Sequence, residues 1–284
     1  MNSTKAIPAI DTHIHFWQLS NYHGFDNWFE GRDYLKRDYL PQHLLPELND
    51  IGARGAIIVG AAPDSHSHNL DWGQMCKEHE HVLALVGSYS LTSKKLEQWL
   101  EEYKNERWFV GIRSQPLTHY SQWGNDTEAD KGAKILARHN LAFDMLVDHI
   151  RIPGVRDFAH KHANLPIILN HCGQPPFRND DFSEWEKNIR ELATVDNVMM
   201  KYSSFFLHSY PHCNLNKFKY AASVLFESFG PKRLLWGSNW PPELVGGSYK
   251  EAFEIMLSST PKLSINEKEH LLYRNAIQVY QLKI

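Results

Sequence analysis

Two histidines separated by a single residue stand directly after the first apolar segment of the sequence. His13 and His15 belong to the run Asp-Thr-His-Ile-His at residues 11–15. Alternate residues of a β-strand share a face, so both imidazoles are expected to point the same way. Two imidazoles directed at one point provide half of a metal site, or a pair that can activate a water molecule.

The same His-x-His spacing occurs three more times, at residues 66/68, 79/81 and 160/162. Those pairs fall on expected helices or helix starts, where side chains two residues apart diverge. Only His13 and His15 end an expected strand. Their placement, rather than the spacing alone, makes them the candidate pair.

Two later apolar runs also end in polar side chains. His171 alternates with Ile167 and Leu169, so we expect it to face the interior beyond the apolar layers. Asn239 follows the run at residues 234–237. Its amide can donate or accept a hydrogen bond but cannot move a proton as a carboxylate can. Both residues are therefore candidates for the site, with His171 the one able to carry a proton.

Three charged residues lie within apolar runs. Lys201 stands in the run at 197–202 and needs an anionic or carbonyl partner if it is buried. Arg113 ends the run at 110–113, where its guanidinium fork suits a carboxylate or a carbonyl. Asp144 could act as a base, a ligand or the partner of Lys201 or Arg113. We expect Lys201 and Arg113 to bind substrate or polarise its carbonyl group.

An aromatic segment follows the first strand, from Gln18 to Tyr39. Trp17 and Trp28 are its candidates for shaping a pocket, together with Trp240 after the last strand. The segment either covers the site or packs on the rim of the fold, and both can hold. A second set of candidates lies after the seventh strand, where Pro211 breaks any helix and no metal spacing can be read. Its members are His208, His212 and Cys213.

Short apolar runs alternate with amphipathic stretches along the whole chain. The runs that predict buried parallel strands are 9–14, 55–59, 83–87, 110–113, 141–147, 166–169, 197–202 and 234–237. The expected helices are 44–49, 70–78, 93–103, 129–139, 155–162, 182–192, 217–229 and 249–256. Eightfold alternation predicts a closed (β/α)8 TIM barrel, here one domain over residues 1–284. A doubly wound open sheet usually has a glycine-rich loop after its first strand, and none follows here.

The composition excludes several classes of protein. A net charge of −3 at pH 7 argues against a nucleic-acid partner. Three scattered cysteines imply no disulfide framework. No apolar run is long enough for a signal peptide or a membrane span. We expect a cytoplasmic enzyme acting on a small molecule, with its oligomeric state left open, a homodimer included.

Short motifs spread over nearly the whole chain resemble those of a known protein family. They are Ile-Asp-Thr-His-Ile-His at 10–15, Gly-Ile-Arg at 111–113, His-x-Gly at 171–173, Lys-x-Ser at 201–203, Gly-Ser-Asn-Trp-Pro at 237–241 and Asn-Ala-x3-Tyr-x-Leu at 275–282. In this order they resemble the amidohydrolase-related (amidohydrolase-2) family, in the branch of sugar-acid and pyrone lactonases. The resemblance implies that the first-strand histidines, the sixth-strand histidine and an acidic residue of the strand-eight motif shape the site.

Two positions depart from that family pattern. The usual Asp of the strand-eight motif is Asn239, and the usual Asp-His-x-Gly reads Asn170-His171-x-Gly. The resemblance makes that strand-eight Asp the general acid/base and a metal ligand in metal-using relatives, so its replacement weakens both expectations. Lactonases of this branch include members that look metal-independent. One zinc ion held by His13, His15 and His171, or no metal, both stay open.

The expected reaction is water attack on the carbonyl of a small lactone, from a sugar acid or a ring-cleavage product. His171 or the first-strand pair would activate the water, and Asn239 would orient it or the carbonyl. One alternative is a zinc-dependent decarboxylase or another hydrolase of the same fold. A second is a sugar-acid-binding protein that has lost catalysis, which the two Asn substitutions suggest.

Overall fold

The computed structural model describes residues 7–21, 29–61, 66–114 and 127–284. Within these ranges eight parallel strands follow one another around one sheet in chain order. They are β1 (Ala9–Ile14), β2 (Ala53–Val59), β3 (Val82–Ser88), β4 (Phe109–Ser114), β5 (Ala142–Met145), β6 (Ile167–Leu169), β7 (Val198–Tyr202) and β8 (Leu234–Trp236). A parallel bridge between Ile14 and Trp240 brings the end of β8 back to β1. The predicted TIM barrel is confirmed.

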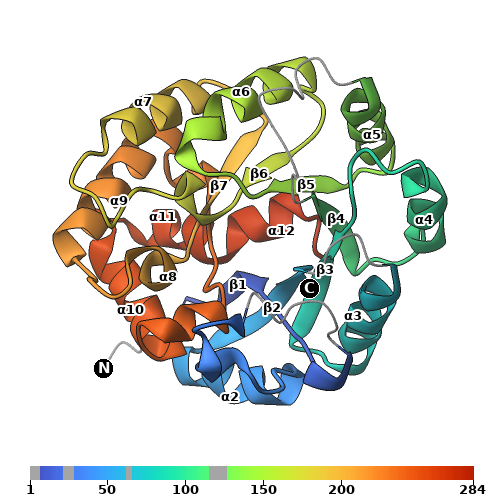
Figure 1. Cartoon of the computed structure of the whole chain (residues 1–284), viewed down its shortest axis with the longest axis horizontal. Coiled ribbons are helices and arrows are strands. Elements are labelled where there is room, and N and C mark those ends of the chain that lie inside the picture. The colour runs from blue at the N-terminus through green and yellow to red at the C-terminus, as the bar shows by residue number, and fades with distance from the viewer. Residues whose placement is uncertain (1–6, 22–28, 62–65, 115–126) are drawn as a thin grey trace.

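Helices form a ring around these strands (Figure 1). They are α2 (Pro41–Ile51), α3 (His66–Glu78), α4 (Leu96–Tyr103), α5 (Thr127–Arg138), α6 (Ile152–Lys161), α7 (Ser183–Leu192), α9 (Leu215–Phe229) and α10 (Tyr249–Ser259). Each expected helix overlaps one of them. A short helix that the sequence did not indicate, α8 (Phe205–Ser209), follows β7 directly. It begins beside the site.

The strands separate two apolar layers. Along β5, Phe143 and Met145 join the large cluster that packs against the helices. Ala142 joins a second, smaller cluster with Ile10, Val59, Ile168 and Leu235. Because side chains alternate along a strand, the second cluster is the interior of the barrel and Asp144 faces the same interior.

The C-terminal segment closes one mouth of the barrel. It comprises α11 (Ile265–Glu269), the π-helical turn η8 (His270–Arg274) and α12 (Asn275–Val279), which crosses the middle of Figure 1. Asn275 donates hydrogen bonds to the carbonyl oxygens of Pro231 and Leu234, at the start of β8. Tyr280 packs into the interior cluster. The amino ends of the strands are therefore covered, which leaves their carboxyl ends for a site. No helix in the described ranges is long and apolar enough to span a membrane.

Candidate active site

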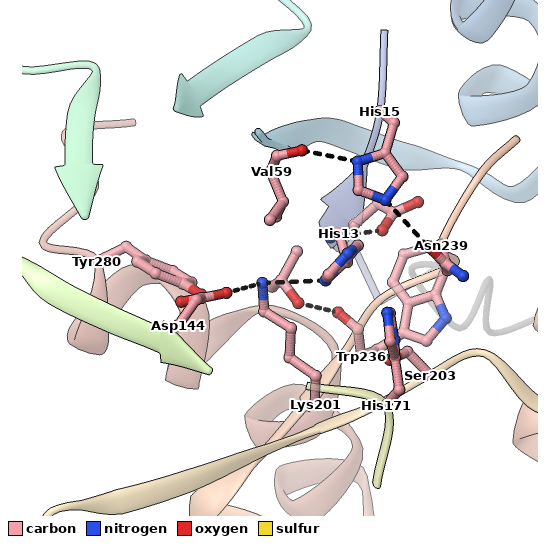
Figure 2. A network of polar contacts seen from close by, with 12 residues as sticks. His13, His15, Val59, Asp144, His171, Lys201, Ser203, Trp236, Asn239 and Tyr280 are labelled. Atoms are coloured by element: carbon pink, nitrogen blue, oxygen red, sulfur yellow. Dashed lines mark hydrogen bonds and ion pairs between the residues drawn. The ribbon is translucent and has the colours of Figure 1, made fainter. Parts of the chain in front are cut away.

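Three imidazoles meet at the carboxyl ends of the strands. The ring centre of His13 lies 5.0 Å from that of His15 and 4.4 Å from that of His171. All three side chains are buried. Figure 2 shows them grouped around Asn239, with the Lys201 side chain beside them. Residues 158 positions apart in sequence thus reach one point, as the barrel topology requires.

A bulge in β1 turns the first two histidines inward. Asp11 pairs with Ala56 and Ile14 pairs with Ile58, so three steps on β1 match two on β2. Ile10 faces the interior, and without the extra residue the histidines would face the helices instead. The sequence predicted that His13 and His15 share a face, and the bulge decides which face it is.

The buried carboxylate of Asp11 holds this bulge together. Its Oδ1 accepts hydrogen bonds from the backbone N–H of His13 at 3.0 Å and of Ser238 at 2.8 Å. Its Oδ2 accepts one from the hydroxyl of Tyr249 at 2.9 Å. Burial raises the pKa of Asp11 to about 6, although these hydrogen bonds oppose the shift. The residue therefore ties β1 to the loop after β8 and sets the position of His13.

His15 has a defined tautomer. Its Nδ1 lies 2.7 Å from the carbonyl oxygen of Val59, which can only accept, so the ring proton sits on Nδ1. Burial and the charge of Arg113 lower the pKa of His15 to about 3, which keeps the ring neutral. Its Nε2 therefore carries a lone pair, 3.1 Å from Oδ1 of Asn239.

His171 reaches the site by a route different from the one expected. Ile168 packs in the barrel interior whereas Leu169 packs against the helices, so the predicted inward alternation of His171 with Leu169 is wrong. Strand β6 ends at Leu169, and His171 adopts a left-handed backbone with φ of +55°. This turn, rather than strand alternation, brings its ring to His13. Nδ1 of His171 lies 2.9 Å from the hydroxyl oxygen of Ser203.

A neutral imidazole at position 171 can accept a proton. Burial lowers the pKa of His171 well below 6.5, and the neighbouring His208 and Arg113 lower it further. The neighbouring amide of Asn170 is also buried, and neither of its polar atoms has a hydrogen-bond partner among the described residues. The turn thus supplies a base and an amide with unused hydrogen-bonding capacity.

Lys201 and Asp144 form a buried ion pair beneath the histidines. Nζ of Lys201 donates to Oδ2 of Asp144 at 2.6 Å, and both side chains are fully buried. The other carboxylate oxygen accepts a hydrogen bond from the hydroxyl of Tyr280 at 2.9 Å. Burial lowers the pKa of Lys201, and Asp144 opposes that shift. Of the partners the sequence left open for Asp144, the structure selects Lys201.

The same lysine fixes the proton of His13. Its Nζ lies 3.4 Å from Nδ1 of His13, and an ammonium group can only donate. Nδ1 of His13 therefore accepts this hydrogen bond, and the proton of the neutral ring is on Nε2. Burial, followed by the charge of Lys201, keeps the pKa of His13 well below 6.5. His13 thus presents an N–H group from Nε2, a buried atom with no partner among the described residues.

The remaining candidate residues differ in how they lie relative to the three imidazoles. Arg113 is buried at the end of β4, beside Asp144 in register, and its charge lowers the pKa of His15. Trp17 and Trp240 are each only 2% exposed and both pack edge-on against Tyr39, on the rim. Trp28 lies outside the described residues.

Of the three candidate residues in the loop after β7, one lies near the imidazoles and two do not. His208 is near the site, with its ring centre 5.8 Å from that of His171, and burial lowers its pKa to about 4. His212 and Cys213 line a surface hollow instead, next to Pro211. This hollow is formed by the consecutive residues 211–216, from the loop and the first turn of α9, so of the three candidates only His208 adjoins the imidazole cluster.

Sequence reasoning missed Glu243, which follows the strand-eight motif. It is buried and accepts hydrogen bonds from the backbone N–H groups of Phe206 and Leu207, at 2.6 and 3.1 Å. Its backbone N–H donates to the carbonyl oxygen of Asn239 at 3.1 Å, and burial raises its pKa to about 7. The signal in the sequence was an acidic residue directly after Trp-Pro-Pro, at the catalytic end of a barrel strand.

The polar atoms of the site do not form a metal cage. A catalytic zinc usually takes three protein ligands, each offering a lone pair. Nε2 of His13 carries a proton instead, because Lys201 donates to its other nitrogen. Asn239 supplies a neutral oxygen, and within the described ranges no three His, Cys, Asp or Glu side chains are grouped to hold a metal ion. The residues present do not fit a preformed zinc site.

Known proteins resemble this chain over most of its length. The L-fucono-1,5-lactonase of Burkholderia ambifaria is 29% identical over 84% of this chain and 82% of its own. The L-fucono-1,5-lactonase of Burkholderia multivorans is 27% identical over 96% of each chain. A crystal structure of an amidohydrolase from Burkholderia multivorans with bound zinc has a TM-score of 0.90 at 26% identity, covering 97% of this chain and 100% of that one.

A family model described as Amidohydrolase matches residues 10–282. This range begins one residue before the carboxylate that holds the β1 bulge, and it ends in the segment that closes the barrel. It includes β1 from Ile10 onward, the seven other strands, the three imidazoles, the buried ion pair and Asn239. The chain belongs to the amidohydrolase family.

Proposed function

We propose that this chain is a hydrolase that opens the lactone ring of a small sugar acid. One observation carries the proposal: a neutral imidazole at His171 stands beside an N–H donor at His13, with a buried cation below. That set can remove a proton from water and stabilise the oxyanion that follows. The two L-fucono-1,5-lactonases, at 27% and 29% identity, support this substrate class.

Attack by water begins the reaction. The tautomer of His171 in which Nδ1 donates to Ser203 leaves the lone pair of Nε2 free to take a proton from water. The water oxygen then bonds to the lactone carbonyl carbon, and the carbonyl oxygen becomes an alkoxide. Asn239 holds the same water through its side-chain oxygen.

The alkoxide forms close to buried positive charges. Nε2–H of His13 donates to it, and Lys201 stabilises it through His13 rather than by direct contact, because the lysine is occupied by Asp144. Arg113 adds a second buried positive charge. Collapse of the intermediate breaks the bond to the ring oxygen, and His171 returns its proton to that oxygen. One water is consumed and a hydroxy acid is released.

A panel of aldonolactones, read by a pH indicator, tests the proposal. L-Fucono-1,5-lactone and its stereoisomers form the core of the panel, with simple aliphatic lactones as controls for ring opening without sugar recognition. We expect saturable turnover of at least one sugar lactone and its loss in His171→Asn. A folded protein that is thermally stabilised by these compounds but turns over none would indicate a sugar-acid-binding protein instead.

A further inference from the structure

The proposed base, His171, stands on a turn of the chain that has the uncommon left hand. Four consecutive residues, 171–174, have φ between +51° and +65°, directly after β6. Two backbone hydrogen bonds close the turn, from the N–H of Gly173 to the carbonyl of Asn170 at 3.1 Å and from that of Gln174 to the carbonyl of His171 at 2.8 Å. Three of the four residues carry side chains, whose Cβ atoms crowd the following carbonyl oxygen in this conformation. The turn is therefore strained and needs contacts from outside to keep its shape.

Cys172 ties this turn to two neighbouring elements. Its Sγ lies 3.5 Å from the carbonyl oxygen of Lys201, in β7, and 3.9 Å from that of Ser203, which follows β7. Its own carbonyl oxygen accepts a hydrogen bond from Nε1 of Trp185 at 2.8 Å. A thiol is a weak donor, so the bond from the indole is the stronger restraint on the turn.

Trp185 is a fixed anchor in the outer ring of helices (Figure 1). It lies in the first turn of α7, its side chain is fully buried, and Phe182 packs edge-on against it with ring centres 5.9 Å apart. Trp185 and Cys172 both belong to the apolar cluster that packs against the helices, whereas the ring of His171 lies against that of His13. The indole thus holds the turn from the helix side, and the imidazole projects toward the site.

The position of the His171 ring depends on the shape of the turn. Among the described residues its ring has one hydrogen-bonding contact, from Nδ1 to Oγ of Ser203 at 2.9 Å, and Figure 2 shows the two side chains next to each other. One contact fixes one atom of the ring, and the backbone must set the rest. A base has to lie within hydrogen-bonding reach of the proton that it removes, so a small change in the turn moves the ring out of reach.

We infer that Trp185 is a positioning residue: by holding the carbonyl oxygen of Cys172, it keeps the left-handed turn in the form that directs His171 toward the attacking water. This inference rests on the proposed lactone hydrolysis, because it concerns the base of that reaction. Trp185 acts through the backbone of Cys172 and not on the substrate. The residues that determine the rate then include one from a helix of the outer ring.

Trp185→Phe tests the inference by removing the N–H group and keeping most of the aromatic volume. The turn loses its main restraint, and the base moves. Since a displacement of about 1 Å can cost about 100-fold in rate, we expect kcat on the lactone to fall at least about tenfold, with KM little changed.

Trp72→Phe is the matched control for this variant. It removes the same kind of bond, from a buried indole of α3 to the carbonyl oxygen of Phe16 at 3.1 Å. Both variants should lose a similar amount of thermal stability, but the control should lose much less kcat. An equal fall of kcat in the two would mean that turnover follows stability, and would overturn the inference.

Gln174→Gly provides a rescue that support of the fold alone would not give. Gln174 is partly exposed, and its φ of +51° is one that glycine adopts without strain. In the native background this substitution should raise the melting temperature, and a fall would contradict the strain of the turn. In the Trp185→Phe background it should restore part of the lost kcat, because the turn then needs less support. Gln174→Ala keeps the strain, and an equal rescue by alanine would count against the inference.

The background His171→Asn separates an effect on the base from an effect on the rest of the site. Trp185→Phe should cost no further kcat in this background, because the side chain that it positions is already gone. A further loss as large as in the native background would show that Trp185 supports the site in general, and the inference would fail.

The ring nitrogen resonances of His171 report its position without any substrate. In Trp185→Phe we expect the Nδ1 resonance of His171 to shift, because its contact with Ser203 changes, while that of His15, held by Val59, stays. An unchanged His171 resonance in a folded variant contradicts the inference. The shift in a protein that turns over no lactone would reject only the proposed function.

Discussion

The ammonium group of Lys201 lies 3.4 Å from Nδ1 of His13, and this contact makes His13 a donor rather than a lone-pair ligand. The lysine itself is held by the carboxylate of Asp144. A charge pair buried below the site thus decides the proton arrangement of an imidazole above it. The predictions that follow depend on this arrangement.

Removing one member of the ion pair should destabilise the fold strongly. Lys201→Met leaves the fully buried carboxylate of Asp144 without its cation, and we expect the free energy of unfolding to fall by about 3–5 kcal/mol. The double variant Lys201→Met/Asp144→Asn should recover much of that loss without recovering lactone turnover. Urea denaturation measures both. Equal stability of the single and double variants would show that the pair is not coupled.

His171→Asn should remove the base and keep the fold. The amide is close in size to the imidazole and can still bond to Ser203. We expect kcat/KM to fall by about 100-fold or more, as for loss of a general base, with the melting temperature little changed. His162→Asn is a control that alters a histidine paired with Asp130 on the outer helices. A comparable loss in that control would discredit the assignment.

Asp11 offers a matched pair of variants for the β1 bulge. Asp11→Asn keeps an oxygen for the N–H groups of His13 and Ser238, and its NH2 can donate to the hydroxyl of Tyr249. Asp11→Ala leaves all three donors without their acceptor. We expect a loss of about 3 kcal/mol or more for Ala and about 1 kcal/mol or less for Asn, with kcat following the same order. Thermal and urea unfolding check this, and similar effects of both would argue against the bulge being held by Asp11.

Stability should fall as the pH drops below about 6.5. Burial lowers the pKa of five histidines of the described residues, His13, His15, His81, His171 and His208, so the unfolded chain takes up protons there that the folded chain does not. Two buried carboxyl groups act in the opposite sense, because burial raises the pKa of Asp11 to about 6 and of Glu243 to about 7.

These five histidines outweigh the two carboxyl groups, so the protein loses stability on acidification through the range from 6.5 to about 5. The melting temperature measured between pH 8 and pH 5 checks this, and His208→Gln should flatten the slope by removing one of the five histidines. A melting temperature that rises toward pH 5 would show that the carboxyl groups, and not the histidines, dominate the pH dependence of stability.

Turnover should not depend on zinc. Because Nε2 of His13 carries a proton and Asn239 contributes a neutral oxygen, we expect the purified protein to keep full lactone turnover after dialysis against a strong chelator. Metal analysis of the same sample should find far less than one zinc per chain. The opposite outcome is one zinc per chain, with activity lost when the zinc is removed and regained when it is restored. That outcome would support the predicted ligand set of His13, His15 and His171.

The strand order, and the side chains that meet at the mouth of the barrel, could be predicted from the sequence. Period-two alternation placed His13 and His15 on one face, and the apolar runs located the strands. The alternation rule failed where the backbone departs from it, at the bulge after Asp11 and at the left-handed residue His171. Neither departure leaves a clear mark in a single sequence.

Glu243 was missed for a different reason. Its carboxylate contacts backbone groups of α8, which lie 36 and 37 positions away along the chain. Pairings of that kind depend on the packing of two loops, and no spacing rule describes them. Lys201 and Asp144 could be proposed as partners because a buried charge requires an opposite one.

The hydroxyl of Tyr280 completes the hydrogen bonding of a carboxylate 136 positions earlier in the chain. During synthesis, the seven strands that precede β8 can emerge from the ribosome well before this tyrosine does. Until it arrives, Oδ1 of Asp144 lacks this hydrogen bond, and we expect the Lys201–Asp144 pair to be open to water. The nascent enzyme is therefore expected to gain its dry interior, and with it the proton pattern of its histidines, only after Tyr280 has been made.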